Sequence, residues 1–169
     1  MAEQIALRPA LPADAPALAA LFRASVEELA LEDYSEAQVE AWSALADDEA
    51  AFAQKLAGEL TIIALIGGEI AGFASLKGGD VLDMLYVHPA FARRGVATGL
   101  VDAIEKLAGA RHAATLTAEV SDCAQGFFAA RAYAPQKRNM VFLGDEVLGN
   151  TTMTKKLAPK GAPKPEKMQ

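Results

Sequence analysis

The middle of the chain runs from an apolar segment through a basic, glycine-containing turn into an amphipathic segment. The apolar segment covers Val81 to Val87, the turn reads Ala92-Arg93-Arg94-Gly95-Val96-Ala97, and apolar residues at helical spacing fill Leu100 to Leu107. This order predicts a strand, a tight turn and a helix. The first N–H groups of a helix lack intrahelical acceptors and carry the positive end of the helix dipole. Because the glycine permits close approach and the arginines add charge, the turn is predicted to bind a phosphate group.

The neighbouring segments constrain the sheet. A further apolar segment, Thr115 to Val120, follows the helix, and a helical crossover between two such strands makes them parallel. Upstream, Gly67-Gly68 separates apolar runs at Leu60–Ile66 and Ile70–Leu76, which is typical of a hairpin with a two-residue turn. The sheet is therefore predicted to be mixed, with a ligand site at the carboxyl ends of its strands near residues 93–97.

The other elements follow from periodicity and capping residues. Ser35 and Gln38 resemble a capping box, and Ser121 is expected to cap the helix after the parallel strand. The predicted fold is α/β, a mixed and mostly antiparallel central sheet flanked by helices in the order β-α-α-β-β-β-α-β-α-β-β. The other expected segments are a strand at 4–7, helices from 12 or 14 to 29, from 35 to 45, at 50–56, 94–108 and 122–132, and strands at 137–143 and 150–157.

Length and composition limit the classes of protein that fit. The 169 residues are 52% apolar and 22% charged, as expected of one globular domain, here residues 1–157. Residues 158–169 carry three prolines and three lysines with few apolar residues, which predicts a disordered tail. The formal net charge of −6 argues against nucleic-acid binding and suits an amine substrate.

The residue pattern predicts neither a metal site nor a membrane segment. Cys123 is the only cysteine, so the chain forms no intrachain disulfide and no cysteine-based zinc cluster. His88 and His112 lack the spacing of metal ligands. The N-terminus lacks a signal-peptide pattern, and the apolar runs are too short to cross a bilayer. The chain is therefore expected to be cytoplasmic, with no metal and no membrane partner.

With these elements in place, the chain resembles the GNAT superfamily of acetyl-CoA-dependent N-acetyltransferases. The superfamily signature is Gln or Arg, two residues, Gly, one residue, then Gly or Ala, and it falls on Ala92 to Ala97. Ala92 departs from this signature, and Arg93 is the candidate to take over the missing phosphate contacts. The preceding Leu85-Tyr86-Val87-His88-Pro89 is also similar to the family. Many relatives have a Phe-Tyr pair where this chain has Phe127-Phe128.

The resemblance implies where acetyl-CoA lies. In GNAT proteins, the strand equivalent to 81–87 splays from its parallel neighbour, and its free backbone groups pair with the pantetheine arm of the cofactor. The Val87 N–H would stabilise the oxyanion, and the amides of residues 93–98 would hold the pyrophosphate. The residues expected to bind the cofactor are Leu85, Tyr86, Val87, Arg93, Arg94, Gly95, Val96, Ala97, Thr98 and Phe128.

Acetyl transfer to an amine requires a proton acceptor, because a lysine-like amine has a pKa of about 10.4 and is protonated at neutral pH. Asp83 and Glu119 are the candidate bases, since each interrupts an apolar strand, and water is an open alternative. Asp83, two residues before Leu85, is expected to share its face of the strand. The acid is open, because Phe128 cannot donate the proton that a tyrosine provides in many relatives, and Tyr86 is the candidate replacement.

Two aromatic residues, Tyr34 and Trp42, are candidates for the acceptor site. The leading hypothesis is an acetyltransferase that moves acetyl from acetyl-CoA to a primary amine of a small molecule or peptide by direct attack in a ternary complex. Phe128 motivates the alternative, a catalytically impaired acyl-CoA-binding module. A nucleotide-binding domain of another type is disfavoured, because the phosphate-loop and dinucleotide motifs are absent from the sequence. A monomer and a homodimer both fit.

Overall fold

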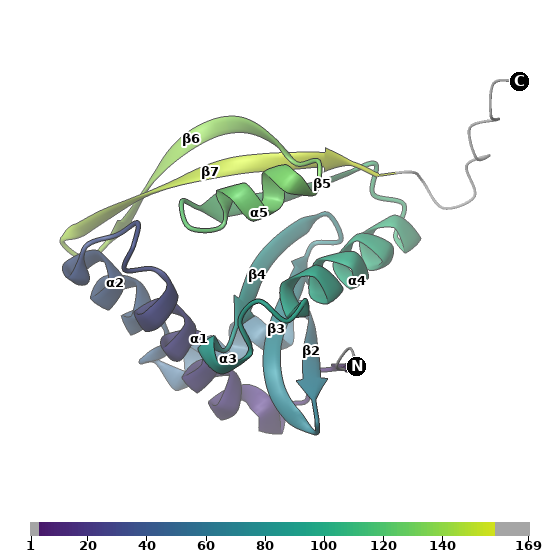
Figure 1. Cartoon of the computed structure of the whole chain (residues 1–169), viewed down its shortest axis with the longest axis horizontal. Helices are drawn as coiled ribbons and strands as arrows, with labels where there is room; N and C mark the ends of the chain where they lie inside the picture. Colours follow the sequence, from purple (N-terminus) through teal and green to yellow (C-terminus); the bar gives the residue numbers. More distant parts are fainter. Residues whose placement is uncertain (1–3, 158–169) are drawn as a thin grey trace, which may run out of the picture.

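The computed structural model describes residues 4–157, which form a seven-stranded sheet with helices on both faces (Figure 1). The strands follow the spatial order β1-β2-β3-β4-β5-β7-β6, and all neighbours are antiparallel except β4 and β5. The predicted α/β class and mixed, mostly antiparallel sheet are confirmed; the short helix expected at 50–56 is present as a third helix between the first strands, which the predicted element order omitted. The elements are β1 (Ile5–Pro9), η1 (Pro12–Asp14), α1 (Ala15–Leu29), α2 (Glu36–Ser43), η2 (Ala44–Ala46), α3 (Glu49–Gly58), β2 (Leu60–Ile66), β3 (Glu69–Lys77), β4 (Val81–Val87), η3 (Pro89–Phe91), α4 (Val96–Ala110), β5 (Thr115–Ser121), α5 (Gln125–Ala130), β6 (Ala134–Leu143) and β7 (Glu146–Lys156).

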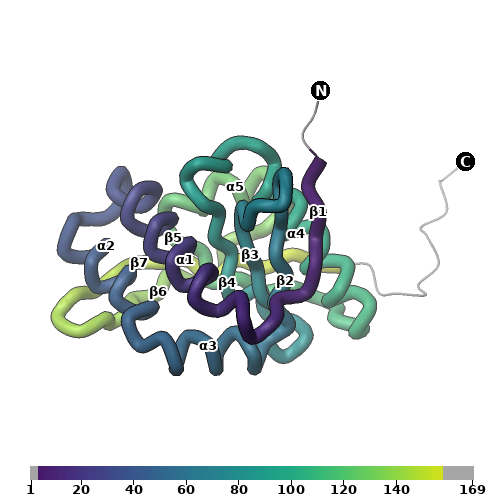
Figure 2. The backbone as a smooth tube through the Cα atoms, turned by 90° about the horizontal axis from the view of Figure 1, so that it is seen from below, coloured from purple at the N-terminus to yellow at the C-terminus, as the bar shows by residue number. Residues whose placement is uncertain are grey.

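Two hydrophobic cores lie on opposite faces of the sheet. Helices α1, α2 and α3 cover one face, where Leu18, Phe22 and Val26 of α1 are buried (Figure 2). Helices α4 and α5 cover the other face, where Leu100 and Ile104 of α4 are buried. Each set recurs every three or four residues and so forms one apolar stripe along its helix. Two covered faces explain why β2 and β3 have nearly continuous apolar sequences.

The sheet divides between β4 and β5. Strand β4 pairs with β3 along its whole length. Its parallel pairing with β5 is limited to Val81 with Thr117 and Leu82 with Ala118. Among the described residues, no strand therefore lies beside the other edge of β4 at residues 83–87.

A β-bulge sits where the two strands part. The β3–β4 register shifts between Leu82 and Met84, which leaves Asp83 as the extra residue. Asp83 forms an ion pair with Lys55 of α3, whereas Leu85 packs into the core beneath α4. The expectation that Asp83 shares the face of Leu85 is therefore wrong, because the bulge resets the alternation of side chains.

Close packing between α4 and β3 depends on Gly72. An ideal Cβ at this position lies 2.8 Å from Val96 Cγ1, 2.9 Å from Tyr86 O and 3.2 Å from Leu100 Cδ1. The first two distances are too short for a real Cβ, so only glycine fits without movement. The missing side chain lets the first turn of α4 rest against the end of β4.

The final hairpin is longer than predicted. Strands β6 and β7 meet at a two-residue turn, in which Gly144 has a φ of +58°. Gly149 lies inside β7, where the guanidinium of Arg138 occupies the space above its missing side chain. The strand therefore begins before residue 150, where the sequence predicted it to start.

The predicted cap of α5 is also wrong. Ser121 belongs to β5, and its Oγ lies 3.1 Å from the Sγ of Cys123. The helix begins at Gln125, after Ala124, and no side chain among the described residues caps it. The predicted tail, 158–169, lies outside the described residues. Within residues 4–157, no helix is both long and apolar enough to cross a membrane.

Candidate active site

The turn between β4 and α4 presents backbone N–H groups at the end of a helix. Gly95 is the N-cap of α4 with a φ of +82°, and no side chain from residues 4–157 caps this end. The N–H of Gly99 is the first to bond within the helix, donating to Gly95 O at 3.0 Å. Arg93 is also left-handed, with a φ of +65°. Such strain in a residue other than glycine costs about 1–2 kcal/mol and is concentrated at ligand sites.

Neighbouring side chains order this turn and give it positive charge. His88 Nδ1 accepts the N–H of Ala90 at 3.1 Å, so this histidine stabilises the turn. The side chains of Arg93 and Arg94 are exposed, and the guanidinium of Arg94 lies 5.5 Å from the ring centre of Phe91. Helix amides, a left-handed glycine and two arginines together form a site suited to a diphosphate.

The open edge of β4 leads directly into this turn. Leu85 and Val87 face the α4 side of the sheet, whereas Tyr86 faces the α1 side. The five residues from Asp83 to Val87 span about 14 Å, four steps of about 3.4 Å each. An extended, amide-bearing arm can pair with this edge while its diphosphate meets the turn. The residues present therefore fit acetyl-CoA.

Asp83 lies at the apex of the split and is held by a cation. Lys55 Nζ lies 2.6 Å from Asp83 Oδ2. Burial alone would raise the pKa of Asp83. Hydrogen bonding with Lys55 and Glu59, with the charges of Lys55 and Lys77, outweighs burial and holds this pKa below its ordinary value. The carboxyl group is therefore ionised at neutral pH.

Aromatic rings run from β4 to the segment between α1 and α2. The ring centre of Tyr86 lies 4.6 Å from that of Phe22, 5.7 Å from that of Phe73 and 6.3 Å from that of Trp42. Trp42 in turn lies 5.6 Å from Tyr34, edge to face. Burial raises the pKa of the Tyr86 hydroxyl, and hydrogen bonding with Trp42 offsets part of that rise. The Tyr86 hydroxyl therefore stays protonated at neutral pH.

The hydroxyl of Tyr34 joins the segment between α1 and α2 to the β5–β7–β6 half of the divided sheet. Tyr34 is buried, and its hydroxyl donates to Gly149 O at 2.7 Å and accepts the N–H of Asp122 at 2.9 Å. These bonds join the α1–α2 segment to β7 and to the end of β5. Tyr34 and Trp42, predicted to contact the acceptor, thus lie on the same side of the sheet as Tyr86.

Glu119 lies apart from Asp83, on β5. Its neighbours Ala118 and Val120 are buried under α4 and α5, so Glu119 faces the opposite side. There its carboxylate accepts hydrogen bonds from Asn139 Nδ2 at 2.8 Å and Thr152 Oγ1 at 2.9 Å. Glu119 is exposed and belongs to a polar ladder across β5, β7 and β6.

Phe128 packs in the core and has no polar atom to offer. It is 3% exposed, and its ring lies edge to face with Phe127 and Tyr133. The Tyr133 hydroxyl donates to Glu105 Oε2 at 2.9 Å, and Glu105 also accepts from Lys155 at 2.8 Å. The aromatic residues of this region therefore tie α5 to α4.

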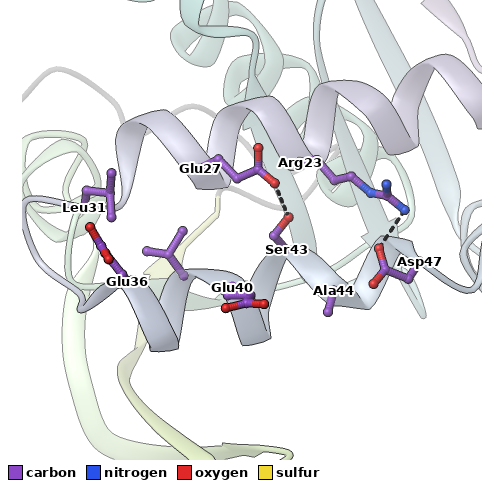
Figure 3. Close-up of a pocket in the computed structure, with 9 residues that line it drawn as sticks. Arg23, Glu27, Leu31, Glu36, Glu40, Ser43, Ala44 and Asp47 are labelled. Atoms are coloured by element: carbon purple, nitrogen blue, oxygen red, sulfur yellow. Dashed lines mark hydrogen bonds and ion pairs between the residues drawn. The ribbon is translucent and has the colours of Figure 1, made fainter.

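A separate hollow of about 450 Å³ lies between α1 and α2 (Figure 3). Arg23 pairs with Asp47 at 2.8 Å, and Ser43 Oγ donates to Glu27 at 2.8 Å. Its described lining includes no residue of β4, β5 or the turn at 93–98, so the hollow lies outside the candidate active site. The residues that line it are Arg23, Glu27, Leu31, Glu36, Val39, Glu40, Ser43, Ala44 and Asp47.

The chain belongs to the GNAT family of N-acetyltransferases, because the acetyltransferase (GNAT) domain model matches residues 30–157. The chain is 32% identical over 137 residues to the uncharacterized N-acetyltransferase YafP of Escherichia coli K12, covering 81% of this chain and 86% of the relative. A solved structure from Rhodopseudomonas palustris, described as a GCN5-related N-acetyltransferase (aminotransferase, class-II), is 56% identical. It covers 93% of this chain and 99% of its own, with a TM-score of 0.91.

A more distant structure shows the same fold. The PaiA N-acetyltransferase of Thermoplasma acidophilum, in complex with coenzyme A, is 18% identical and has a TM-score of 0.74. The match covers 90% of this chain and 99% of the other. The GNAT fold predicted from the basic turn and the element order is therefore confirmed.

Sequence reasoning missed the partners of Asp83. Lys55 and Glu59 lie four residues apart across the end of α3; Lys55 pairs with both Asp83 and Glu59, and Glu59 accepts a hydrogen bond from Ser75 of β3. The available signal was Glu59 itself, a carboxylate placed directly before the buried strand β2. Glu59 lies near the start of β4 because β2, β3 and β4 are successive antiparallel strands, which brings the start of β2 level with the start of β4.

Proposed function

We propose that this protein transfers the acetyl group of acetyl-CoA to a primary amine by direct attack in a ternary complex. The observation that carries the proposal is the open edge of β4 beyond Leu82, which leads into the left-handed turn at Gly95. An amide-bearing thioester and its diphosphate match these two features in the same order. Membership of the GNAT family supports acetyl-CoA as the donor.

The cofactor is bound mainly by backbone groups. The amides of residues 95–98 and the side chains of Arg93 and Arg94 bind the diphosphate, while the backbone of residues 85–87 pairs with the arm. Acetyl-CoA supplies the activated acetyl thioester. Phe128 of α5 supports the site from the core through the contacts of its ring with Phe127 and Tyr133.

Asp83 is the proposed base. It lies where the sheet begins to open, on the α1–α3 side, and its lowered pKa keeps it ionised. It takes the proton of the acceptor ammonium directly or through one water. Glu119 is the second candidate, and its exposed carboxylate is also suited to hold an ammonium group. Tyr86 is the proposed acid for the leaving thiolate.

The acceptor approaches from the α1–α2 side. Tyr34 and Trp42 lie on this side beside Tyr86. The polar ladder that contains Glu119 extends the same surface along β5. The negative net charge favours a cationic amine. We propose a small-molecule or peptide amine as the acceptor class.

Thiol release from acetyl-CoA tests this function against a panel of primary amines. We expect amine-dependent release in the wild type and a loss of about 10²-fold or more in Asp83→Asn, with Glu119→Gln measured in parallel. Acetyl-CoA binding without release for any amine would instead support an impaired acyl-CoA-binding module. A larger loss in Glu119→Gln than in Asp83→Asn would assign the base to Glu119.

Gly95→Trp tests the phosphate site. The bulky indole would cover the amides that meet the diphosphate, so we expect acetyl-CoA binding to be lost in calorimetric titration. Gly144→Trp is the matched control, because Gly144 is also left-handed, with a φ of +58°, but lies at the β6–β7 hairpin. Both changes strain the backbone by about 1–2 kcal/mol. Equal affinity of the two variants would refute the phosphate assignment.

A further inference from the structure

A second carboxyl group lies behind Asp83. Lys55 Nζ lies 3.3 Å from Glu59 Oε2 as well as 2.6 Å from Asp83 Oδ2, so one ammonium spans both carboxyl groups. Ser75 Oγ donates to Glu59 Oε1 at 2.7 Å. Helix α3 and strands β3 and β4 thus contribute to one polar cluster at the bulge.

Burial within this cluster is graded. The Glu59 side chain is 6% exposed and Ser75 is 0% exposed, whereas the Asp83 side chain is 21% exposed. Asp83 is therefore the member that an acceptor can reach, and Glu59 lies behind it. The buried oxygen of Asp83, Oδ2, contacts the Lys55 ammonium, while the carboxyl group as a whole keeps partial exposure toward the acceptor side.

The environments of the two carboxyl groups shift their pKa values in opposite directions. Burial raises the pKa of Glu59, the Ser75 hydrogen bond lowers it, and Asp83 raises it further. Burial alone would raise the pKa of Asp83, but Lys55, Glu59 and Lys77 outweigh burial and hold this pKa below its ordinary value. Paired carboxyl groups with separated pKa values are typical of acid–base sites.

We propose that Glu59 is a positioning residue that shares a proton with Asp83 and holds the proton that Asp83 takes from the acceptor. This inference rests on the proposed acetyltransferase function. An N–H bond of the ammonium breaks, and its proton binds Asp83 and passes to Glu59; it then leaves to solvent by way of the partly exposed Asp83. The neutral nitrogen bonds to the thioester carbon, the C–S bond breaks, and a second amine proton ends on sulfur. One ammonium and one thioester thus give one amide, one thiol and one free proton.

Glu59→Gln tests this role in the thiol-release assay, with the most active amine of the panel. Glutamine keeps the size of the side chain but cannot hold the proton, so we expect kcat to fall about tenfold with an unchanged KM for acetyl-CoA. On the acid side of a plot of log kcat/KM against pH, the slope should fall by about one, because one of the two coupled carboxyl groups has been removed. Glu27→Gln is the matched control, since Glu27 also accepts from a serine, Ser43, but on the outer side of α1.

Carbon-13 NMR titration of the carboxyl groups provides a readout independent of turnover. We expect Glu59 to titrate above its ordinary pKa in the wild type and at lower pH in Asp83→Asn, because the neighbouring carboxylate is removed. If Glu59→Gln does not fold, Ser75→Ala serves instead. It removes a hydrogen bond that lowers the Glu59 pKa, so the acid limb should move to higher pH.

The outcomes separate this inference from the function on which it rests. A wild-type protein that acetylates no amine overturns the proposed function. Amine turnover with the same pH slope in Glu59→Gln and Glu27→Gln overturns the role of Glu59 alone. A Glu59 carboxyl that titrates at its ordinary pKa, unmoved by Asp83→Asn, overturns it as well.

Discussion

Gly72→Ala should loosen the contact between β3 and the first turn of α4. The new Cβ would lie 2.8 Å from Val96 Cγ1 and 2.9 Å from the backbone oxygen of Tyr86. The valine methyl can rotate away, but the backbone oxygen belongs to a paired strand and cannot move alone. Helix α4 must therefore shift by a few tenths of an ångström or more.

The size of the effect follows from two opposing contributions. Overpacking of a filled core costs about 1–3 kcal/mol. Replacing a glycine inside a strand by alanine stabilises the fold by about 0.5–1 kcal/mol, because the unfolded chain has less freedom. We expect the free energy of unfolding to fall by about 1–2 kcal/mol, which lowers Tm by roughly 2–8 °C in a protein of this size.

Thermal unfolding followed by circular dichroism measures this change, and calorimetric titration with acetyl-CoA measures its consequence for the turn. Affinity should fall, because the amides after Gly95 move with α4. Gly126→Ala is the control. It lies in α5, and a Cβ there meets no described atom within 4 Å, so Tm should stay or rise. An unchanged or higher Tm in Gly72→Ala would refute the close packing.

Two further predictions concern stability. Tyr34→Phe removes the buried hydrogen bonds to Gly149 and Asp122 and should lower the free energy of unfolding by about 2–3 kcal/mol, measured by urea unfolding. A decrease below about 0.5 kcal/mol would show that these hydrogen bonds do not stabilise the fold. The Arg8 side chain holds the pKa of Asp14 below its ordinary value, so this pair stabilises the fold above that value and the contribution is lost as pH falls. Asp14→Asn should therefore lower Tm at neutral pH and flatten its decline below about pH 5; a wild-type curve would show that the pair adds nothing.

Much of the fold was readable because local signals and global topology agree. The Ser35 capping box is present, with Gln38 N–H bonded to Ser35 Oγ at 3.1 Å. The Gly67-Gly68 turn joins β2 to β3, and the helical crossover does separate two parallel strands. The capping box and the hairpin turn need only neighbours in sequence to form, and the parallel pairing follows from a helical segment placed between two apolar runs.

The features that sequence reasoning missed depend on distant residues. The bulge at Asp83 comes from the register with β3, which the alternation of β4 alone does not reveal. Gly149 stays inside a strand because Arg138, eleven residues upstream, fills the space above it. Ser121 has the composition of a helix cap but continues β5, since its partner in β7 extends the pairing to Asn150. In each case, tertiary pairing outweighs a local preference.

The presence of Phe128 in place of a tyrosine is a weak argument that the protein lacks a general acid, because one of its three tyrosines has a hydroxyl proton available. The hydroxyl of Tyr34 donates to Gly149 O, and that of Tyr133 donates to Glu105, so both protons are engaged. Burial raises the pKa of Tyr86 and hydrogen bonding with Trp42 offsets part of that rise, as expected when the Tyr86 oxygen accepts and its own proton stays available. A residue buried as deeply as Phe128 would need a partner for a hydroxyl, whereas Tyr86 already lies beside the open edge of β4. The proposed acid is therefore on the strand that faces the thioester, and the core position is free to pack.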